Sequence, residues 1–197
     1  KKSIVEVTPF RTEGEYKDGR HPENVSWAKD IKTDISRRDF TCNAMAYSFT
    51  KNELVDPFVG LKDIKDRVLR AVGEADVRFN EDALRLMRAL RFSGQLDFKI
   101  EENTEKSLIN NAGLIQNISH ERVRDEFCKI LLTPNPKQVL EYASQLGILK
   151  YFLPELERGI GISQNQAHKF DVWEHNLRTM QHAVDKNWPL ELRLAAL

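Results

Sequence analysis

The stretch FNEDALRLMRALRFSGQL, residues 79–96, decides the fold class of this chain. Apolar side chains recur along it three positions apart, at Leu84, Met87 and Leu90, which predicts an amphipathic helix with one face in a core. The sequence before this stretch has the pattern of short strands and turns, and the sequence after it keeps the helical spacing. We therefore expect an α+β protein that is mainly α.

The first 73 residues carry strand and turn signals. IVEVTPF at 4–10 alternates apolar and polar side chains, and AYSF at 46–49 followed by ELVD at 53–56 has the pattern of a hairpin. A short helical segment, LKDIKDR at 61–67, follows a Pro and Gly pair of breakers. The pattern indicates a small β-containing unit over 1–73.

The rest of the chain is predicted to form helices joined by turns. The predicted helices are NTEKSLINNA at 103–112, SHERVRDEFCKILL at 119–132, PKQVLEYASQL at 136–146 and FDVWEHNLRTMQHAVDK at 170–186. A looser stretch precedes the last of them. We therefore expect a helical neck and body over 74–155, and a linker with a further helical unit over 156–197.

The composition is typical of a globular protein, with 41% hydrophobic and 30% charged residues. No apolar run approaches the roughly 20 residues that a membrane span needs. Cys42 and Cys128 have no metal-ligand spacing, which indicates buried free thiols in a reducing cytoplasm. The formal net charge is zero, but this does not exclude an RNA partner, because a basic stripe can be balanced by acidic surface elsewhere.

An acidic and a basic side chain are spaced for base recognition in EDALRLMRALRF. Asp82 and Arg85 are three positions apart, so a continuous helix would put both on one face. An acceptor beside donors matches the edge of cytosine or adenine, which has an amino group beside a bare ring nitrogen, and not uracil or guanine. Arg88 and Arg91 continue the face in three-residue steps, where they can bind phosphates. A surface helix with an ordinary ion pair is the alternative.

The run RRDFTCNA, residues 37–44, places three charges before a small apolar segment. Arg37 and Arg38 can bind a triphosphate in a forked, bidentate way. Asp39 or Asn43 can hydrogen-bond ribose hydroxyls, which would separate ribonucleotides from deoxyribonucleotides. A strand end with solvated charges, in which Asp39 caps the following turn, explains the run equally well.

Four stretches in series resemble the class II tRNA nucleotidyltransferases. They are RRDFTCNA, DPFVGLKDIKDRVLRAVG at 56–73, FNEDALRLMRALRFSGQLDFKIEENT at 79–104, and SHERVRDEFCKILL. The family comprises the CCA-adding enzymes, the A-adding enzymes and bacterial poly(A) polymerases, and the resemblance covers essentially the whole chain. It implies a nucleotide pocket between the remnant of a β-containing nucleotidyltransferase head and a helical neck.

The resemblance also implies roles for single residues. Near the triphosphate and ribose it places Arg37, Arg38, Asp39 and Asn43, and it makes Asp82 and Arg85 the base template, with Arg88 and Arg91 nearby. In SHERVRDEF, Glu121 and Arg122 match a further motif that supports the neck, and Arg124 lies beside it. An intrahelical ion-pair network is the alternative for these three.

Residues 5–27 resemble the flexible loop of CCA-adding and A-adding enzymes. The residues on its polar pattern are Arg11, Glu13, Tyr16, Asp18 and Arg20. Because CC-adding relatives shorten or lack this loop, its presence favours an enzyme that can add the terminal A. An ordinary polar hairpin is the alternative.

The family's metal ligands are missing from the sequence. The family pattern requires two aspartates one residue apart, after a glycine-rich turn, and neither element occurs here. We therefore expect the Mg²⁺ ligands upstream of this chain, no catalytic carboxylates within it, and a truncated piece that transfers nothing by itself. HKFDVWEHNL at 168–177 resembles the start of an HD domain that is cut before its His-Asp dyad, so we predict no metal at His175.

The leading hypothesis is a cytoplasmic tRNA nucleotidyltransferase. It would add C, A or both from CTP and ATP to the 3′ end of tRNA, would bind the acceptor stem, and would not associate with membranes. A bacterial poly(A) polymerase, a non-catalytic tRNA-binding helical module, and a phosphohydrolase at the HD-like end remain as alternatives.

Overall fold

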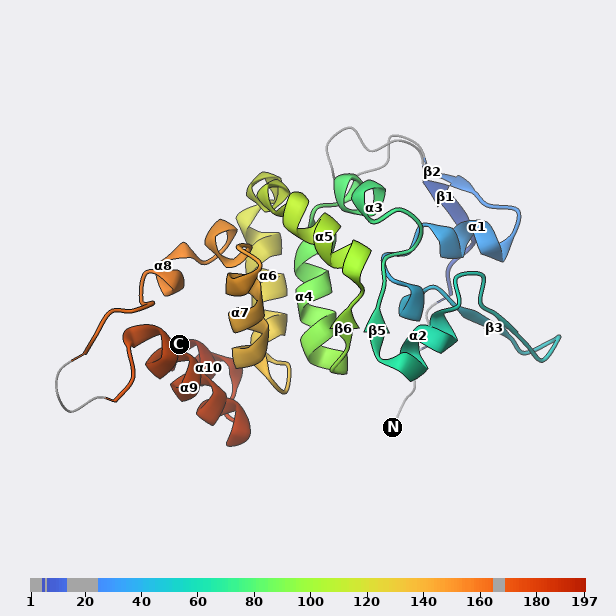
Figure 1. The fold of residues 1–197 in the computed structure, drawn as a ribbon. Coiled ribbons are helices and arrows are strands. Elements are labelled where there is room, and N and C mark those ends of the chain that lie inside the picture. Colours follow the sequence, from blue (N-terminus) through green and yellow to red (C-terminus); the bar gives the residue numbers. More distant parts are fainter. Residues whose placement is uncertain (1–4, 6, 14–24, 165–168) are drawn as a thin grey trace.

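The computed structural model describes residues 5, 7–13, 25–164 and 169–197. Figure 1 shows a strand-containing part at one end, a central group of helices, and α9 and α10 at the other end. Helices dominate and the strands are short, which confirms the predicted α+β, mainly α class. The expected divisions after residues 73 and 155 stay predictions. Among the described residues, no helix combines the length and the apolar character that a membrane span requires.

The elements follow one another along the chain from strands to helices. The strands are β1 (Arg11–Glu13), β2 (Val25–Trp27), β3 (Ala46–Ser48), β4 (Glu53–Val55), β5 (Val68–Leu69) and β6 (Lys99–Ile100). The helices are α1 (Ile31–Ser36), α2 (Gly60–Asp66), α3 (Ala75–Glu81), α4 (Leu84–Leu96), α5 (Glu102–Asn110), α6 (His120–Leu131), α7 (Pro136–Gln145), α8 (Pro154–Glu157), α9 (Val172–Asp185) and α10 (Leu190–Ala195). Three 3-10 turns are η1 (Thr41–Asn43), η2 (Ala112–Asn117) and η3 (Leu149–Tyr151).

The strands form three separate two-stranded ladders. β1 pairs antiparallel with β2, and β3 with β4, which confirms the predicted hairpin. This hairpin projects from the end of the molecule opposite α9 and α10 (Figure 1). β5 and β6 pair in parallel. The prediction of a strand over 4–10 was wrong for the residues described there, because pairing begins only where the Phe10 carbonyl accepts the Ala28 N–H, directly after a proline that has no N–H to give.

Helix α4 lies at the centre of the helical part. Its apolar face carries Leu86, Met87 and Leu90, all fully buried, and it packs against α6 and α7. The spacing in residues 79–96 predicts an apolar face with Met87 and Leu90, although the helix that carries it begins only at Leu84. The same core reaches Phe40 beside the strands. The segment around residue 40 and helix α4 therefore share one core, and this holds the candidate site together.

Gly94 lets α4 and α7 approach closely. A Cβ atom at this position would lie 2.1 Å from Val139 Cγ2 of α7. We expect Gly94→Ala to lower the free energy of unfolding by roughly 1–3 kcal/mol, because overpacking outweighs the better helix propensity of alanine. Urea denaturation measures this. Gly113→Ala is the control, since a Cβ there meets nothing within 4 Å. Equal unfolding midpoints for the two variants would contradict the close packing.

The helix predicted over 79–96 is broken at Asp82. α3 ends at Glu81 and α4 begins at Leu84, and Asp82 between them has an extended backbone with φ −145° and ψ 103°. Its Oδ1 atom accepts the Leu84 N–H at 3.1 Å, a local bond with which aspartate competes against the helix. The prediction that Asp82 and Arg85 share one helix face was therefore wrong, and their relation has to be read from the tertiary structure.

Candidate functional site

A basic pocket of about 550 Å³ lies between the segment around residue 40 and the start of α4. It is lined by Arg37, Arg38, Asp39, Asn43, Asp82, Leu84, Arg85, Arg88 and Arg122. Five arginines face two aspartates here, although the whole chain is formally neutral. The structure thus brings together seven of the residues predicted to bind nucleotide and one predicted to support the neck. Of the eight nucleotide-binding predictions, only Arg91 is missing from the pocket.

Asp39 holds Arg88 at the pocket. The Asp39 Oδ2 atom lies 2.7 Å from Arg88 Nε and 2.6 Å from Arg88 Nη2, and its Oδ1 atom accepts the Phe40 N–H at 3.0 Å. The Arg88 guanidinium also lies 5.1 Å from the centre of the Phe92 ring. Paired charges and a buried carboxylate fix the direction of Arg88, as a phosphate-binding arginine requires.

Asp82 pairs with Arg122 rather than with Arg85. Arg122 Nη2 lies 3.1 Å from Asp82 Oδ1 and 3.0 Å from Oδ2, across 40 positions of sequence. Arg122 comes from the first turn of α6, which packs against α4. The ion pair of Arg122 therefore joins α6 to Asp82. It is not part of a network within α6, which was the alternative for Arg122.

Arg85 of α4 forms hydrogen bonds both to α3 and to the backbone of Arg37. Its Nη1 atom donates to Glu81 Oε2 at 2.6 Å and to the Arg78 carbonyl at 2.9 Å, and its Nη2 atom donates to the Arg37 carbonyl at 3.2 Å. The residue is only 8% exposed. A guanidinium has five N–H donors, so these bonds leave two of them for a ligand.

Arg91 faces α6 instead of the pocket. It forms an ion pair at 2.7 Å with Glu126, which is 2% exposed, and its guanidinium lies 4.3 Å from the centre of the Phe92 ring. The reason lies in helix geometry: each three-residue step falls about 60° short of a full turn, so Arg85, Arg88 and Arg91 drift around α4. The prediction of one shared arginine face was wrong for Arg91.

Asp34 contacts two of the pocket arginines and was not among the predicted residues. Its buried carboxylate accepts from Arg37 and from the Arg11 backbone N–H, and Arg38 lies 3.6 Å away. Burial alone would raise the pKa of Asp34, but the hydrogen bonds from Arg37 and Arg11 outweigh it and leave the pKa below its ordinary value. The signal in the sequence was the spacing of three and four residues between Asp34 and the two arginines on a helix end.

The other predicted residues that the structure describes lie outside the pocket. Arg124 pairs with its neighbour Asp125 at 2.8 Å on the surface of α6, where Glu121 is also exposed. Arg11 and Glu13 lie in β1. Three of the loop residues lie outside the part of the chain that the structure describes: Tyr16, Asp18 and Arg20.

Comparisons with known proteins agree with the motifs. A family model described as "Poly A polymerase head domain" matches residues 1–70, and one described as "Probable RNA and SrmB- binding site of polymerase A" matches residues 97–160. The CCA-adding enzyme of Leuconostoc mesenteroides is 44% identical over 182 residues, which are 89% of this chain and 45% of that enzyme. The chain belongs to the family of poly(A) polymerases and tRNA nucleotidyltransferases.

Solved structures of the nucleotidyltransferase family have the same fold. The Bacillus stearothermophilus CCA-adding enzyme in complex with CTP matches with a TM-score of 0.70 and 30% identity, over 96% of this chain and 49% of that one. A tRNA nucleotidyltransferase complexed with a primer tRNA and an incoming ATP analog matches with a TM-score of 0.68 and 30% identity, over 88% and 50%. This chain thus spans half or less of the length of these nucleotidyltransferases.

The described residues offer no ligand set for the Mg²⁺ ion that the family resemblance implies. Within the described ranges, no group of three or more His, Cys, Asp or Glu side chains could hold a metal ion. Asp39 and Asp82 in the pocket are each paired with an arginine. Asp171 caps α9 and accepts the N–H groups of Glu174 and Gly161, which lower its pKa. The residues of this part of the chain therefore do not fit a magnesium site.

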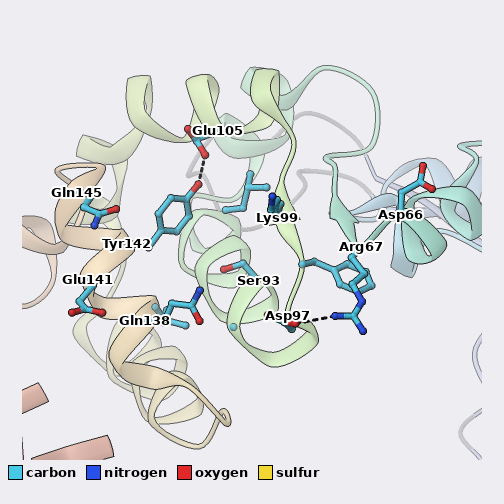
Figure 2. A pocket seen from close by; sticks show the side chains of 14 residues that line it. Asp66, Arg67, Ser93, Asp97, Lys99, Glu105, Gln138, Glu141, Tyr142 and Gln145 are labelled. Atoms are coloured by element: carbon cyan, nitrogen blue, oxygen red, sulfur yellow. Dashed lines mark hydrogen bonds and ion pairs between the residues drawn. The ribbon is translucent and has the colours of Figure 1, made fainter. Parts of the chain in front are cut away.

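A larger cavity lies elsewhere in the chain. It measures about 800 Å³ and is lined by residues of α4, α5, α7 and β6 and by the end of α2. Figure 2 shows Tyr142 donating to Glu105 on one side and Arg67 paired with Asp97 on the other. Burial and the bond to Glu105 raise the pKa of Tyr142 above its ordinary range. No predicted nucleotide-binding residue lines it, so the smaller basic pocket is the candidate site.

The pH dependence of Cys42 alkylation tests whether this thiol, next to the pocket residues Asp39 and Asn43, is buried and faces a negative charge. Burial, followed by the negative charge of Asp39, raises the pKa of this thiol to about 11. The thiolate is the reactive form, so at pH 8 we expect alkylation to be roughly 100-fold slower than for a thiol of ordinary pKa near 9. Iodoacetamide kinetics on a Cys128→Ser variant measure this. The rate should rise tenfold per pH unit up to about pH 11, and a plateau near pH 9 would contradict the shift.

Proposed function

We propose that the protein containing this chain adds C and A from CTP and ATP to the 3′ end of tRNA. The observation that carries the proposal is the basic pocket, in which five arginines surround an Asp82 carboxylate that retains acceptor capacity. A nucleotide substrate has a triphosphate, a ribose and a base, and the pocket contains residues that can bind each of these groups. The proposed substrate, tRNA, implies a cytoplasmic protein.

Asp82 and Arg85 are proposed to read the base. A carboxylate offers about four acceptor sites, and Arg122 and the Leu84 N–H use three of those of Asp82. One acceptor site of Asp82 and two N–H donors of Arg85 remain. An amino group beside a ring nitrogen, as in adenine and cytosine, satisfies both residues. Uracil and guanine present a carbonyl to the carboxylate and leave buried polar groups unpaired.

Arg122 is proposed to set the template carboxylate. Its contact with both oxygens of Asp82 fixes the carboxylate plane. Because Asp82 has an extended backbone outside both helices, the helices alone do not hold its side chain. Arg122 thus supplies from α6 the restraint that a shared helix face would have supplied.

Arg37, Arg38 and Arg88 are proposed to bind the triphosphate. Guanidinium groups suit this role because their donors are planar and forked, and the carboxylates beside them keep those donors in place. Asn43, at the end of η1, lines the same pocket with an amide that can bind a ribose hydroxyl. In this scheme the described residues bind and orient the nucleotide.

The relatives support the choice of substrates. The solved structures similar to this chain include complexes with CTP and with primer tRNA plus an ATP analog. The second candidate is a poly(A) polymerase, which the descriptions of both matching family models favour. That candidate would use the same pocket but repeat the addition of A.

A transfer assay tests the proposal and separates the two candidates. The chain is fused to the preceding segment of the Leuconostoc mesenteroides enzyme, so that the family's metal ligands are present whatever precedes Lys1. A tRNA lacking its last three nucleotides is incubated with CTP and ATP, together and singly. We expect growth by C, C and A, followed by a stop. Long tails of A would support the poly(A) polymerase instead, and tRNA binding without transfer would favour the non-catalytic module.

A further inference from the structure

The carboxylate of Asp34 contacts three residues from two segments of the chain, β1 and the end of α1. It is 6% exposed at the end of α1. Its Oδ1 atom accepts from Arg37 Nε at 3.1 Å, from Arg37 Nη2 at 2.9 Å, and from the Arg11 backbone N–H of β1 at 3.2 Å. Its Oδ2 atom lies 3.6 Å from Arg38 Nη2. One buried negative charge therefore faces two adjacent guanidinium groups.

The backbone beneath these arginines is fixed from the other side. Arg78 of α3 donates to the Ser36 carbonyl at 3.2 Å, and Arg85 of α4 donates to the Arg37 carbonyl at 3.2 Å. The main chain at Arg37 is thus held by α3 and α4, while its side chain is held by Asp34. The backbone and the side chain of this pocket residue are therefore both held by other residues of the protein.

We propose that Asp34 is a positioning residue for the triphosphate, which holds Arg37 and Arg38 in the orientation that binds phosphate. This inference rests on the proposed function of the pocket. Without Asp34, two neighbouring cations repel each other and lose the carboxylate that both of them face, so a ligand would have to order more of both side chains on binding. The ligand class is a nucleoside triphosphate, and the effect should grow with the number of phosphates bound.

Asp34→Asn tests this in the fused protein. The amide oxygen keeps the size of the side chain and can still accept the Arg11 N–H, but the charge is lost. We expect the Kd for ATP to rise about tenfold, and the Kd for AMP to change by less than about threefold. Asp30→Ala is the matched control, because Asp30 caps the same helix through the Thr33 N–H without reaching either arginine. It should leave both constants unchanged.

A double-mutant cycle supplies the decisive measurement. If Asp34 acts through the arginines, Asp34→Asn should weaken ATP binding no further in a chain that already carries Arg37→Ala and Arg38→Ala. An equal loss for ATP and AMP, or the same loss in both backgrounds, would show a merely structural role and overturn the inference. Circular dichroism confirms that each variant is folded.

The arginine variants separate this inference from the proposed function. If Arg37→Ala and Arg38→Ala leave ATP binding intact, the pocket is not the triphosphate site and the proposed function fails. If they weaken it while Asp34→Asn does not, the proposed function stands and only the role of Asp34 is lost.

Discussion

Replacing Asp82 by asparagine is expected to remove most of the selection for A and C over U and G. A carboxylate only accepts hydrogen bonds, whereas an amide can turn its NH₂ group toward the carbonyl of uracil or guanine. Sites that pair with a ligand's polar group reject a mismatch by about 10⁴-fold or more. We therefore expect discrimination to fall to about tenfold, with incorporation of U and G rising. Competition between labelled nucleotides in the transfer assay measures the ratio.

A second carboxylate-to-amide change, at Asp76 of α3, controls for general damage to this region of the fold. Asp76 accepts from Ser107 and Asn111 and does not line the pocket. Asp76→Asn should therefore leave the selection ratio unchanged even if it lowers stability. If the Asp82 variant keeps its preference for A and C, Asp82 does not select the base, and this pocket is not the base-recognition site.

Replacing Glu126 by alanine is expected to lower the free energy of unfolding by about 3–5 kcal/mol. Glu126 is almost fully buried between Arg91, at 2.7 Å, and Lys129, at 2.7 Å. The Arg91 contact is close but misaligned for a hydrogen bond, so its attraction is ionic. Removing the carboxylate leaves the Arg91 cation, 13% exposed, without its partner between α4 and α6. Urea denaturation measures the loss.

Two further variants show whether the buried charge is the cause. Lys129→Ala removes the exposed partner and should cost less than about 1 kcal/mol. The double variant Arg91→Met with Glu126→Met removes both charges, and should regain much of the stability lost by the single change. A double variant no more stable than Glu126→Ala would show that the pair acts by shape rather than by charge.

The pocket was predictable from sequence as a set of residues but not as a geometry. RRDFTCNA and EDALRLMRALRF name most of its lining, because the chemistry of phosphate and base binding restricts residue types. The partner of Asp82 was not predictable, since Arg122 is 40 residues away on another helix. The helix break was hidden as well, because a side-chain bond to one backbone N–H leaves the apolar spacing of the stretch unchanged.

In the fold, too, features set by local sequence were predictable, and features set by tertiary contacts were not. The helices α5, α6 and α7 begin and end close to their predicted bounds, because periodicity and breakers act locally. The drift of Arg91 away from the pocket follows from the helical period and could have been predicted from the sequence. The spacing of Asp34 to Arg37 and Arg38 was visible as well, and only the bond of Asp34 to the Arg11 N–H required β1 to pack on α1. Contacts between elements therefore decided the partner of Asp82 and the full environment of Asp34.

The distance along the chain between Asp82 and Arg122 also sets the order in which the site can be made. A ribosome that adds about 5–20 residues per second needs roughly 2–8 seconds to pass from one to the other. Until α6 has been synthesised and has docked on α4, the newly made carboxylate has no counter-ion from that helix. The proposed nucleotide site is thus complete only after α6 has been made, and a nascent chain that stalls before α6 would expose an unfinished pocket to proteases and chaperones.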